Sequence, residues 1–307
     1  MNKLLVIISV LVIAGIIVIF SGRRETDYSV KYAGYELGGA STGRTNTYSR
    51  YLERYTGVLP AVSDIPVDIF SWNDAKGVSV LEEFEGEKMV LRNEEDGYIE
   101  YKINVDKAGM YNVYLEYFPL TSRGINIERR LKINGQVPFL GADRLVFYRV
   151  WGDGGNKRPD NQGNEIRPAQ VEKPGWEASY FRDALGFITE PYQFYFPAGE
   201  NTFCLEGINE PFAIRSLSLK APVKIQSYRE YLSGINTARF QNERAGFQLK
   251  IQGENAVRRS DPSLYPIYDR SSGATEPASV ARIRLNMIGG DSWRMAGQWI
   301  EWEFNIP

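Results

Sequence analysis

The residues best suited to bind a ligand lie between Trp151 and Trp176. This stretch has no hydrophobic periodicity. It is rich in side chains that donate or accept hydrogen bonds, namely Asp153, Asp160, Asn161, Asn164, Arg167 and Gln170. A sugar presents spread hydroxyl groups and an apolar C–H face, so a protein binds it with planar polar groups and an aromatic platform. The set has the groups that such a site needs, with both tryptophans as candidate platforms.

A structural role for the same stretch is the alternative. The loop would fold on itself, with a salt bridge between Arg167 and Asp160 and with Trp151 covering a sheet edge, or it would pack between modules. Irregular loops of this length are uncommon inside compact domains, where they are functional or disordered. Because tryptophans flank the stretch, we expect an ordered, functional loop.

The remaining reactive residue types argue against catalysis. The chain has no histidine, which excludes Ser-His-Asp and Cys-His nucleophiles and imidazole metal sites. Its single cysteine, Cys204, lies in an apolar run and is expected to be buried. Glycosidases need only two carboxyl groups. However, the acidic residues between 82 and 96 fall at strand ends and turns, where solvated charge is the ordinary explanation. We expect no enzyme activity.

Overall charge also narrows the function. With 36 basic and 38 acidic residues the net charge is −2, so nothing favours a nucleic-acid partner.

Alternating hydrophobicity predicts the elements that carry the loop. Residues 99–105 and 111–117 alternate apolar and polar side chains, which indicates strands with one buried face. Asn134-Gly135 follows another alternating run and predicts a hairpin turn. Many short strands with turn residues between them indicate an all-β sandwich. Tyr48–Tyr55 places aromatic and apolar residues at helical spacing and predicts a short helix that covers the sandwich or packs between modules.

Part of the chain repeats in order. Ile251-Gln-Gly-Glu254 resembles Phe84-Glu-Gly-Glu87, and residues 299–306 resemble 98–105. A Tyr-x-x-Tyr-Leu element stands ahead of each copy, at Tyr48 and at Tyr228. The repeat predicts a second sandwich that is truncated at Pro307, in the front part of a longer protein.

The N-terminus predicts export. An apolar run from Leu4 to Phe20 follows Lys3, which is typical of an uncleaved membrane anchor or of a cleaved signal peptide. Either alternative places the rest outside the cytoplasm, anchored to the cell membrane or secreted. The expected domains are a signal or anchor helix at 1–22, a spacer with a short helix at 23–60, a sandwich at 61–225, and a linker helix with the truncated second sandwich at 226–307.

The ordered motifs resemble those of carbohydrate-binding modules of families 6 and 35. Phe84-Glu-Gly-Glu87 is similar to their opening strand, residues 97–117 to their next hairpin, and Leu131–Gly135 to their Val-Asn-Gly hairpin. Phe196–Leu205 is similar to their Ala-Gly-x-Asn-x-Ile-x-Leu segment, and Ile214–Leu219 to their final strand. The resemblance covers most of 80–220. It implies a galactose-binding-like jelly roll of two antiparallel sheets.

Those modules often hold a structural calcium ion near the opening strand. Glu85 and Glu87 match the acidic pair there, so the resemblance implies a calcium site. Arg215 stands where the modules usually supply an aspartate, and it would pair with Glu85 instead. Both outcomes stay open.

A second resemblance concerns the insert. Residues 127–139, 149–153, 160–172 and 210–214 look like the N-terminal region of large extracellular solute-binding proteins of Bacillota sugar ABC transporters. This implies a non-catalytic accessory region for sugar uptake, with a carbohydrate or cell-surface glycan, the membrane and an ABC permease as partners. Unlike many such proteins, the chain lacks a lipobox cysteine. The alternatives are an accessory module of a secreted glycoside hydrolase or polysaccharide lyase, and a ligand-free spacer.

Overall fold

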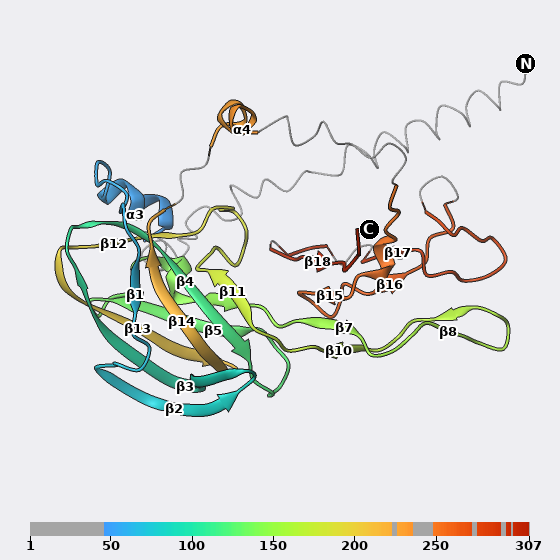
Figure 1. Ribbon diagram of the computed structural model, residues 1–307, viewed down its shortest axis with the longest axis horizontal. Helices are drawn as coiled ribbons and strands as arrows, with labels where there is room; N and C mark the ends of the chain where they lie inside the picture. The colour runs from blue at the N-terminus through green and yellow to red at the C-terminus, as the bar shows by residue number, and fades with distance from the viewer. Residues whose placement is uncertain are drawn as a thin grey trace, which may run out of the picture. The chain divides into compact units, whose positions relative to one another are not determined.

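The expected strands form a β-sandwich in a computed structural model (Figure 1). It describes residues 46–222, 226–235, 248–271, 275–289, 293–295 and 297–306. No helix in these ranges has the length and apolar character needed to cross a membrane. The expected anchor at 1–22 lies outside the described residues, as does most of the spacer.

The sandwich has two antiparallel layers. One layer pairs, in order, β2 (Asp74–Phe84), β3 (Glu87–Val105), β13 (Gly199–Asn209), β5 (Ile127–Ile133) and β6 (Leu145–Phe147). The other contains β1 (Ile65–Val67), β14 (Phe212–Lys220), β4 (Gly109–Pro119), β11 (Glu177–Tyr180) and β12 (Gln193–Phe196). β14 also pairs with residues 91–93 of β3, which joins the layers along one edge.

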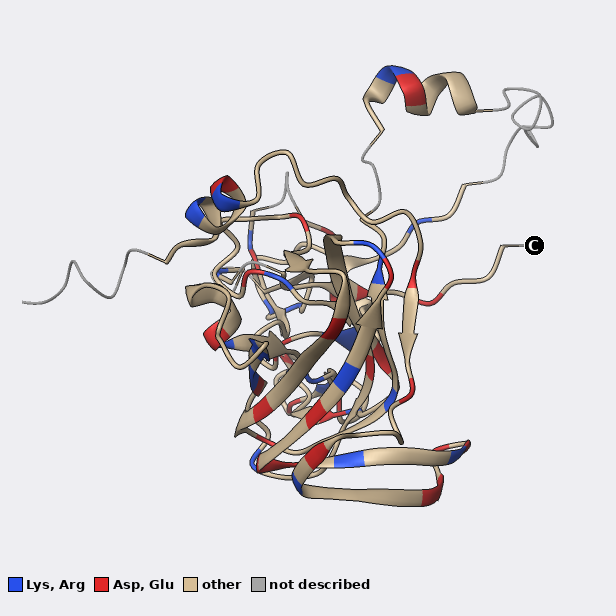
Figure 2. Cartoon of the chain, turned by 90° about the vertical axis from the view of Figure 1, so that its left-hand side faces the viewer, with Lys and Arg blue, Asp and Glu red and all other residues tan. Residues whose placement is uncertain are grey.

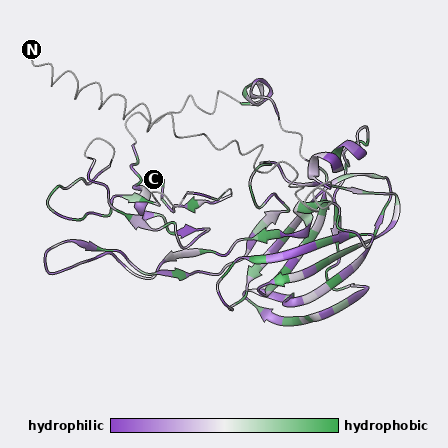
Figure 3. Cartoon of the chain, turned by 180° about the vertical axis from the view of Figure 1, so that it is seen from behind, coloured by the Kyte–Doolittle hydropathy of each residue, from purple (hydrophilic) through white to green (hydrophobic). Residues whose placement is uncertain are grey.

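The alternation predicted for 99–105 is confirmed. Ile99, Tyr101, Ile103 and Val105 are buried, whereas Lys102 and Asn104 between them are exposed. The stripes of hydrophobic and hydrophilic residues along the strands are visible in Figure 3. One continuous core of aliphatic and aromatic side chains fills the space between the layers. Burying one face of each strand is what fixes the register of the sheet.

Charged residues are common on the other faces of the strands. Figure 2 shows basic and acidic residues interspersed along the sandwich. Cross-strand pairs form there, such as Lys102 with Glu200 at 2.9 Å and Arg130 with Glu206 at 3.4 Å. Exposed pairs of this kind contribute about 0–1 kcal/mol each, so the core stabilises the sandwich far more.

The predicted N-terminal helix is α3 (Tyr48–Arg54), and it covers an edge of the sandwich. Thr47 caps it, and Tyr51 is buried in the core. The backbone N–H of Gln193 donates to the Tyr48 hydroxyl at 2.8 Å, and that of Tyr195 donates to Tyr51 at 2.7 Å. The two hydroxyls thus accept hydrogen bonds from backbone N–H groups at the edge of β12. Another strand could otherwise pair with these N–H groups.

The second Tyr-x-x-Tyr-Leu element also forms a helix, α4 (Tyr228–Gly234). Ser227 and Glu230 make a capping box at its start. In contrast to α3, no residue of α4 is buried, and Tyr228 is 76% exposed. The same sequence motif therefore gives a helix twice, but buries a tyrosine only in the first copy.

The stretch after Trp151, expected to be a long loop, is instead an extended hairpin. It consists of β7 (Trp151–Asp153), β8 (Arg158–Pro159), β9 (Glu165–Ile166) and β10 (Gln170–Glu172). Strands of two or three residues are too short to leave a readable period of two in the sequence. We call residues 151–172 the arm.

The segment that repeats the first motifs is built differently. Its elements are η3 (Gly253–Asn255), β15 (Arg258–Arg259), β16 (Pro266–Ile267), β17 (Met287–Ile288) and β18 (Ile300–Glu301). In the first copy residues 91–92 and 99–100 lie on one strand, β3. Their counterparts 258–259 and 300–301 lie on two strands that pair with each other. About 40 intervening residues separate the two motifs here, so the same layout is not found in the described part of 248–306. A further 3-10 helix in the described ranges, η1 (Leu140–Asp143), precedes β6 in the sandwich.

Candidate functional site

The tip of the arm is held by the carboxylate of Asp160. This group accepts the backbone N–H groups of Gln162 and Asn164, both at 2.8 Å, and the Asn164 side-chain amide at 3.0 Å. These hydrogen bonds, led by that from the Asn164 backbone, hold the pKa of Asp160 below its ordinary value. Asp160 therefore shapes the turn and makes no ion pair with Arg167, while Asn161 is exposed at the tip.

The outer half of the arm binds the C-terminal segment, residues 248–306. Glu165 is the main contact, because its backbone N–H donates to the Ile283 carbonyl at 3.1 Å and its carboxylate accepts the Leu285 N–H at 2.7 Å. Arg284 pairs with the same carboxylate at 3.0 Å. The Asn164 side-chain oxygen accepts the Ile283 N–H at 3.0 Å. Asn164 is thus occupied by the protein's own backbone.

The inner half of the arm is part of a sheet with that segment. Its strand order is β10-β7-β15-β18, and Arg259 of β15 lies opposite Trp151 of β7. Figure 1 shows β15 and β18 beside β7 and β10. The sandwich therefore supplies two strands to a sheet that the C-terminal segment completes.

Arg259 is the centre of this contact and is fully buried. Its guanidinium donates to Asp153 at 3.1 Å and to the Gln170 oxygen at 3.0 Å, and the Gln170 amide donates to Asp153 at 2.7 Å. It also donates to the carbonyls of Leu264 and Ala256. Burial lowers the pKa of Arg259, and the Asp153 charge opposes that shift. Asp153 and Gln170 are thus partners of a buried arginine.

Arg167 binds the same segment through an aromatic ring. Its guanidinium lies 3.7 Å from the ring centroid of Tyr265, which is the geometry of a cation–π contact. The arm residues predicted to bind a sugar therefore mostly contact the chain itself, and sugar binding by them remains a prediction.

The two tryptophans lie in different environments. Trp151 is on β7, with its ring next to Gly124. The Trp176 ring packs against Phe84 and Phe118, its N–H donates to the Glu85 carbonyl at 3.1 Å, and Arg215 lies over its face at 4.7 Å. A ring face covered by a guanidinium is not available as a platform for a sugar.

The acidic pair expected to hold calcium does not fit such a site. Arg215 pairs with Glu87 at 3.0 Å and with Glu116 at 2.9 Å, and not with Glu85 as expected. The guanidinium supplies the charge that neutralises Glu87. In the part of the chain that the structure describes, no group of three or more acidic or cysteine side chains is arranged to hold a metal ion. Calcium prefers six to eight oxygen ligands.

A buried ionic cluster at the base of the arm was not predicted. Arg149 is fully buried and pairs with Glu210 and with Glu172 of β10. It also donates to the carbonyls of Leu120, at 2.8 Å, and Ile125, at 2.7 Å. This arginine therefore fixes the arm to the sandwich. A signal was present in the sequence, because Arg149 and Glu210 lie in two of the segments, 149–153 and 210–214, on which the second resemblance rests.

Glu210 has a second cationic partner in that cluster. Arg123 donates to it through its backbone N–H at 3.2 Å and its side chain at 3.1 Å. Burial acts to raise the pKa of Glu210, but the hydrogen bonds from Arg123 and the charge of Arg149 lower it overall. The carboxylate is thus held ionised inside the protein.

Comparison with known proteins concerns the fold. No protein-family model matches the chain, and no curated protein does. Similar solved structures include a family 35 carbohydrate-binding module from Clostridium thermocellum, with a TM-score of 0.33 and 13% identity over 52% of this chain and 99% of that one. The C-terminal family 6 module of the laminarinase LamC from Zobellia galactanivorans gives 0.31 and 12%, over 51% and 98%. A Podospora anserina β-(1,4)-mannanase with a family 35 module gives 0.32 and 12%, over 54% of this chain but 29% of its own. Such values do not assign a family, and the sandwich is established by its own strand pairing.

Proposed function

We propose that the chain is an exported, non-catalytic accessory region of a solute-binding protein for ABC-type sugar uptake. In it, a carbohydrate-binding-like sandwich is coupled through its arm to the C-terminal segment. The ordered motifs shared with such proteins support the transport context. The expected partners are a carbohydrate or cell-surface glycan, the membrane through residues 1–22, and an ABC permease.

The contacts of the arm support the proposal that it joins the sandwich to the C-terminal segment. Asp153, Asn164 and Gln170 have the side chains expected of a sugar site, yet each is hydrogen-bonded within the arm or to the C-terminal segment. A ligand would have to displace these bonds, which include those of the buried Arg259. Leaving a buried arginine without partners is costly, so the arm is better suited to join two parts of the chain than to bind solutes.

The surroundings of Glu177 favour a non-catalytic role over a glycosidase. Burial raises the pKa of Glu177, as in an acid catalyst, although Arg258 opposes the shift. Arg258 pairs with Glu177 and also with Glu301 at 3.3 Å. A guanidinium that pairs with both carboxylates lies where a glycosidase would bind the glycosidic bond.

Removing Arg259 tests the coupling. In the full chain, we expect Arg259→Met to destabilise the C-terminal segment by about 1–3 kcal/mol, because Asp153 and Gln170 lose a charged donor. Hydrogen exchange read by mass spectrometry should then show faster exchange in 254–301 and unchanged exchange in β3 and β13. Arg270→Met is the control, since Arg270 lies over Tyr268 at 5.8 Å and has no bond to the arm. Unchanged exchange in 254–301 would refute the coupling.

The transport context has its own test. The coding sequence that follows Pro307 should encode a lobed ligand-binding domain. A catalytic barrel there would instead support the accessory module of a glycoside hydrolase or polysaccharide lyase. Mass spectrometry of the mature N-terminus would show whether the segment 1–22 is retained as an anchor.

A further inference from the structure

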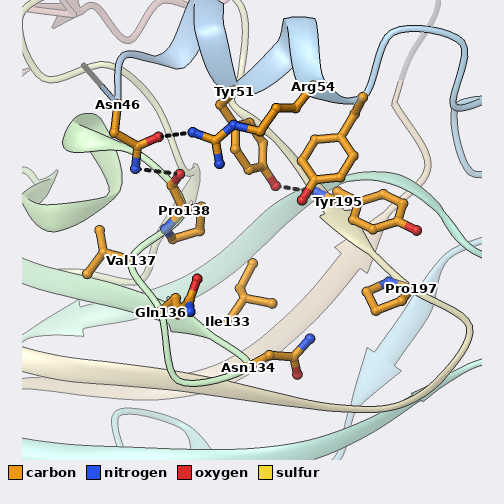
Figure 4. A pocket seen from close by; sticks show the side chains of 11 residues that line it. Asn46, Tyr51, Arg54, Ile133, Asn134, Gln136, Val137, Pro138, Tyr195 and Pro197 are labelled. Carbon is orange, nitrogen blue, oxygen red and sulfur yellow. Dashed lines mark hydrogen bonds between the residues drawn. The ribbon is translucent and has the colours of Figure 1, made fainter.

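A pocket of about 350 Å³ lies at the end of the sandwich away from the arm (Figure 4). β13 runs from Gly199, near the pocket, to Asn209, which precedes Glu210, a partner of Arg149 at the base of the arm. Eleven extended residues span roughly 35 Å, so the two ends are well separated. The pocket lies between α3 and the turn at Asn134, and a cavity of this size is at the lower end of the range for small-molecule sites.

One wall of the pocket is aromatic and rigidly held. The rings of Tyr55 and Tyr195 are stacked, with centroids 4.2 Å apart and planes 20° apart. The backbone of Tyr195 is fixed by its N–H bond to Tyr51, which is itself buried in the core. Val137 and Pro197 add apolar surface. A ligand with a flat apolar face would therefore meet a preformed surface, which reduces the entropy lost on binding.

Polar groups lie around this wall. Asn46 accepts a hydrogen bond from Arg54 at 2.8 Å and donates to the Pro138 carbonyl at 3.0 Å, so it orients the guanidinium, as Figure 4 shows. The Gln136 side chain is exposed on the Asn134 turn and has no hydrogen-bond partner among the described residues. Arg54 retains donors beyond the one bound to Asn46.

Tyr51 adds a donor at the base of the pocket. Its oxygen accepts the Tyr195 N–H, and its own proton has no acceptor in the described ranges. Burial raises the pKa of this hydroxyl above its ordinary value, so it stays protonated. Buried hydroxyl donors normally have a partner, and a ligand hydroxyl can provide one.

We propose that this pocket binds a saccharide unit. A pyranose ring has an apolar C–H face for the stacked tyrosines and hydroxyls for the amide, guanidinium and phenol groups around them. Arg54 is the charged side chain among the described residues that line the pocket, so a neutral, hydroxyl-rich ligand fits it better than a polyanion or a cation. This inference rests on the proposed carbohydrate role but locates it away from the arm.

The pocket is independent of the arm's contacts. None of its lining residues hydrogen-bonds to 248–306 within the described ranges; their bonds go to α3, β12 and the turns of the sandwich. A saccharide can therefore be held while the arm stays bound to the C-terminal segment. Binding and coupling would use opposite ends of one rigid module.

The test uses the full chain and a panel of free gluco-, galacto-, manno- and xylo-oligosaccharides, with affinities measured by calorimetry. We expect Tyr195→Ala to weaken binding about tenfold, through loss of one aromatic contact and its buried surface. Gln136→Ala should weaken it about threefold, as for a neutral hydrogen bond. Because Gln136 is exposed, that variant cannot fail simply by unfolding. Trp151→Ala and Trp176→Ala are the controls and should retain binding.

Two results would overturn the proposal. If the chain binds an oligosaccharide and only the tryptophan variants lose it, the pocket assignment is wrong while the carbohydrate role stands. If the intact chain binds no member of the panel, both are wrong, and the ligand-free spacer is favoured.

Discussion

The sandwich and the C-terminal segment are held together by different forces. The sandwich has strands of up to 19 residues around a continuous apolar core, with rings such as Phe139 and Phe203 fully buried. The segment 248–306 has strands of two residues. Its buried apolar side chains in the described ranges are those of Ala256, Leu264, Pro266 and Leu285, and beside them Glu254, Arg259, Ser260 and Asn286 are buried and polar.

This difference indicates which part depends on the other. Burial of apolar surface is the main stabilising contribution to folding, and the sandwich has one continuous core of it. The segment has little, and gains its order from hydrogen bonds and ion pairs with the arm. Cavities should therefore disturb the sandwich, and changes of charge should disturb the segment.

A cavity in the sandwich core should have the largest effect. Phe203 lies on β13 and is fully buried, so Phe203→Ala should lower the free energy of unfolding by about 3–5 kcal/mol. The arm is anchored in the sandwich, so protection of the C-terminal segment should be lost as well. Urea unfolding followed by circular dichroism measures the first effect, and hydrogen exchange the second.

The matched control for that cavity is Phe187→Ala. Phe187 is 87% exposed, so its truncation should change stability by no more than about 0.5 kcal/mol. Equal urea midpoints for Phe203→Ala and the wild type would show that the core is not what holds the sandwich.

The same contrast explains what the sequence could predict. In residues 99–105 apolar and polar side chains alternate over seven positions, and both residues of the Asn134-Gly135 turn have a positive φ. The local sequence pattern is therefore sufficient to predict these elements. The arm's partners cannot be found in this way. Arg259 meets Asp153 across 106 positions, and its two-residue strand carries no period. The polar residues between 151 and 176 stand out in the sequence, but residue type alone does not distinguish an internal contact from an external ligand.

A smaller effect is expected at the junction between the two regions, where Glu210 binds Arg123 and Arg149. Because the folded-state pKa of Glu210 is lowered, the unfolded chain binds its proton first as the pH falls. The stabilisation is thus complete above the ordinary carboxyl pKa near 4 and is lost on acidification through the lower, folded pKa.

Glu210→Gln should therefore cost about 1–3 kcal/mol at pH 7, with a smaller loss on acidification than in the wild type. Urea midpoints at pH 7 and pH 3.5 give both quantities. Glu53→Gln is the control, since Glu53 is exposed on α3. If Glu210→Gln and the wild type lose the same stability between the two pH values, Glu210 is not the group that titrates.

The smallest effect should come from the outer part of the arm. Arg167→Ala removes the cation–π contact with Tyr265, which is worth about 0.5–1 kcal/mol at an exposed site. Hydrogen exchange around Tyr265 should become two- to fivefold faster at this cost, with no change in the sandwich. Arg158→Ala is the matched control, since Arg158 is an exposed arginine of the same arm and its side chain makes no hydrogen bond, ion pair or ring contact with the described residues of 248–306. If the two variants behave alike, the arm's outer contact does not stabilise the segment. Hydrogen exchange in the C-terminal segment should respond less to Arg167→Ala than to Arg259→Met. This result would show that contacts along the whole arm stabilise the segment, and that the buried arginine contributes most.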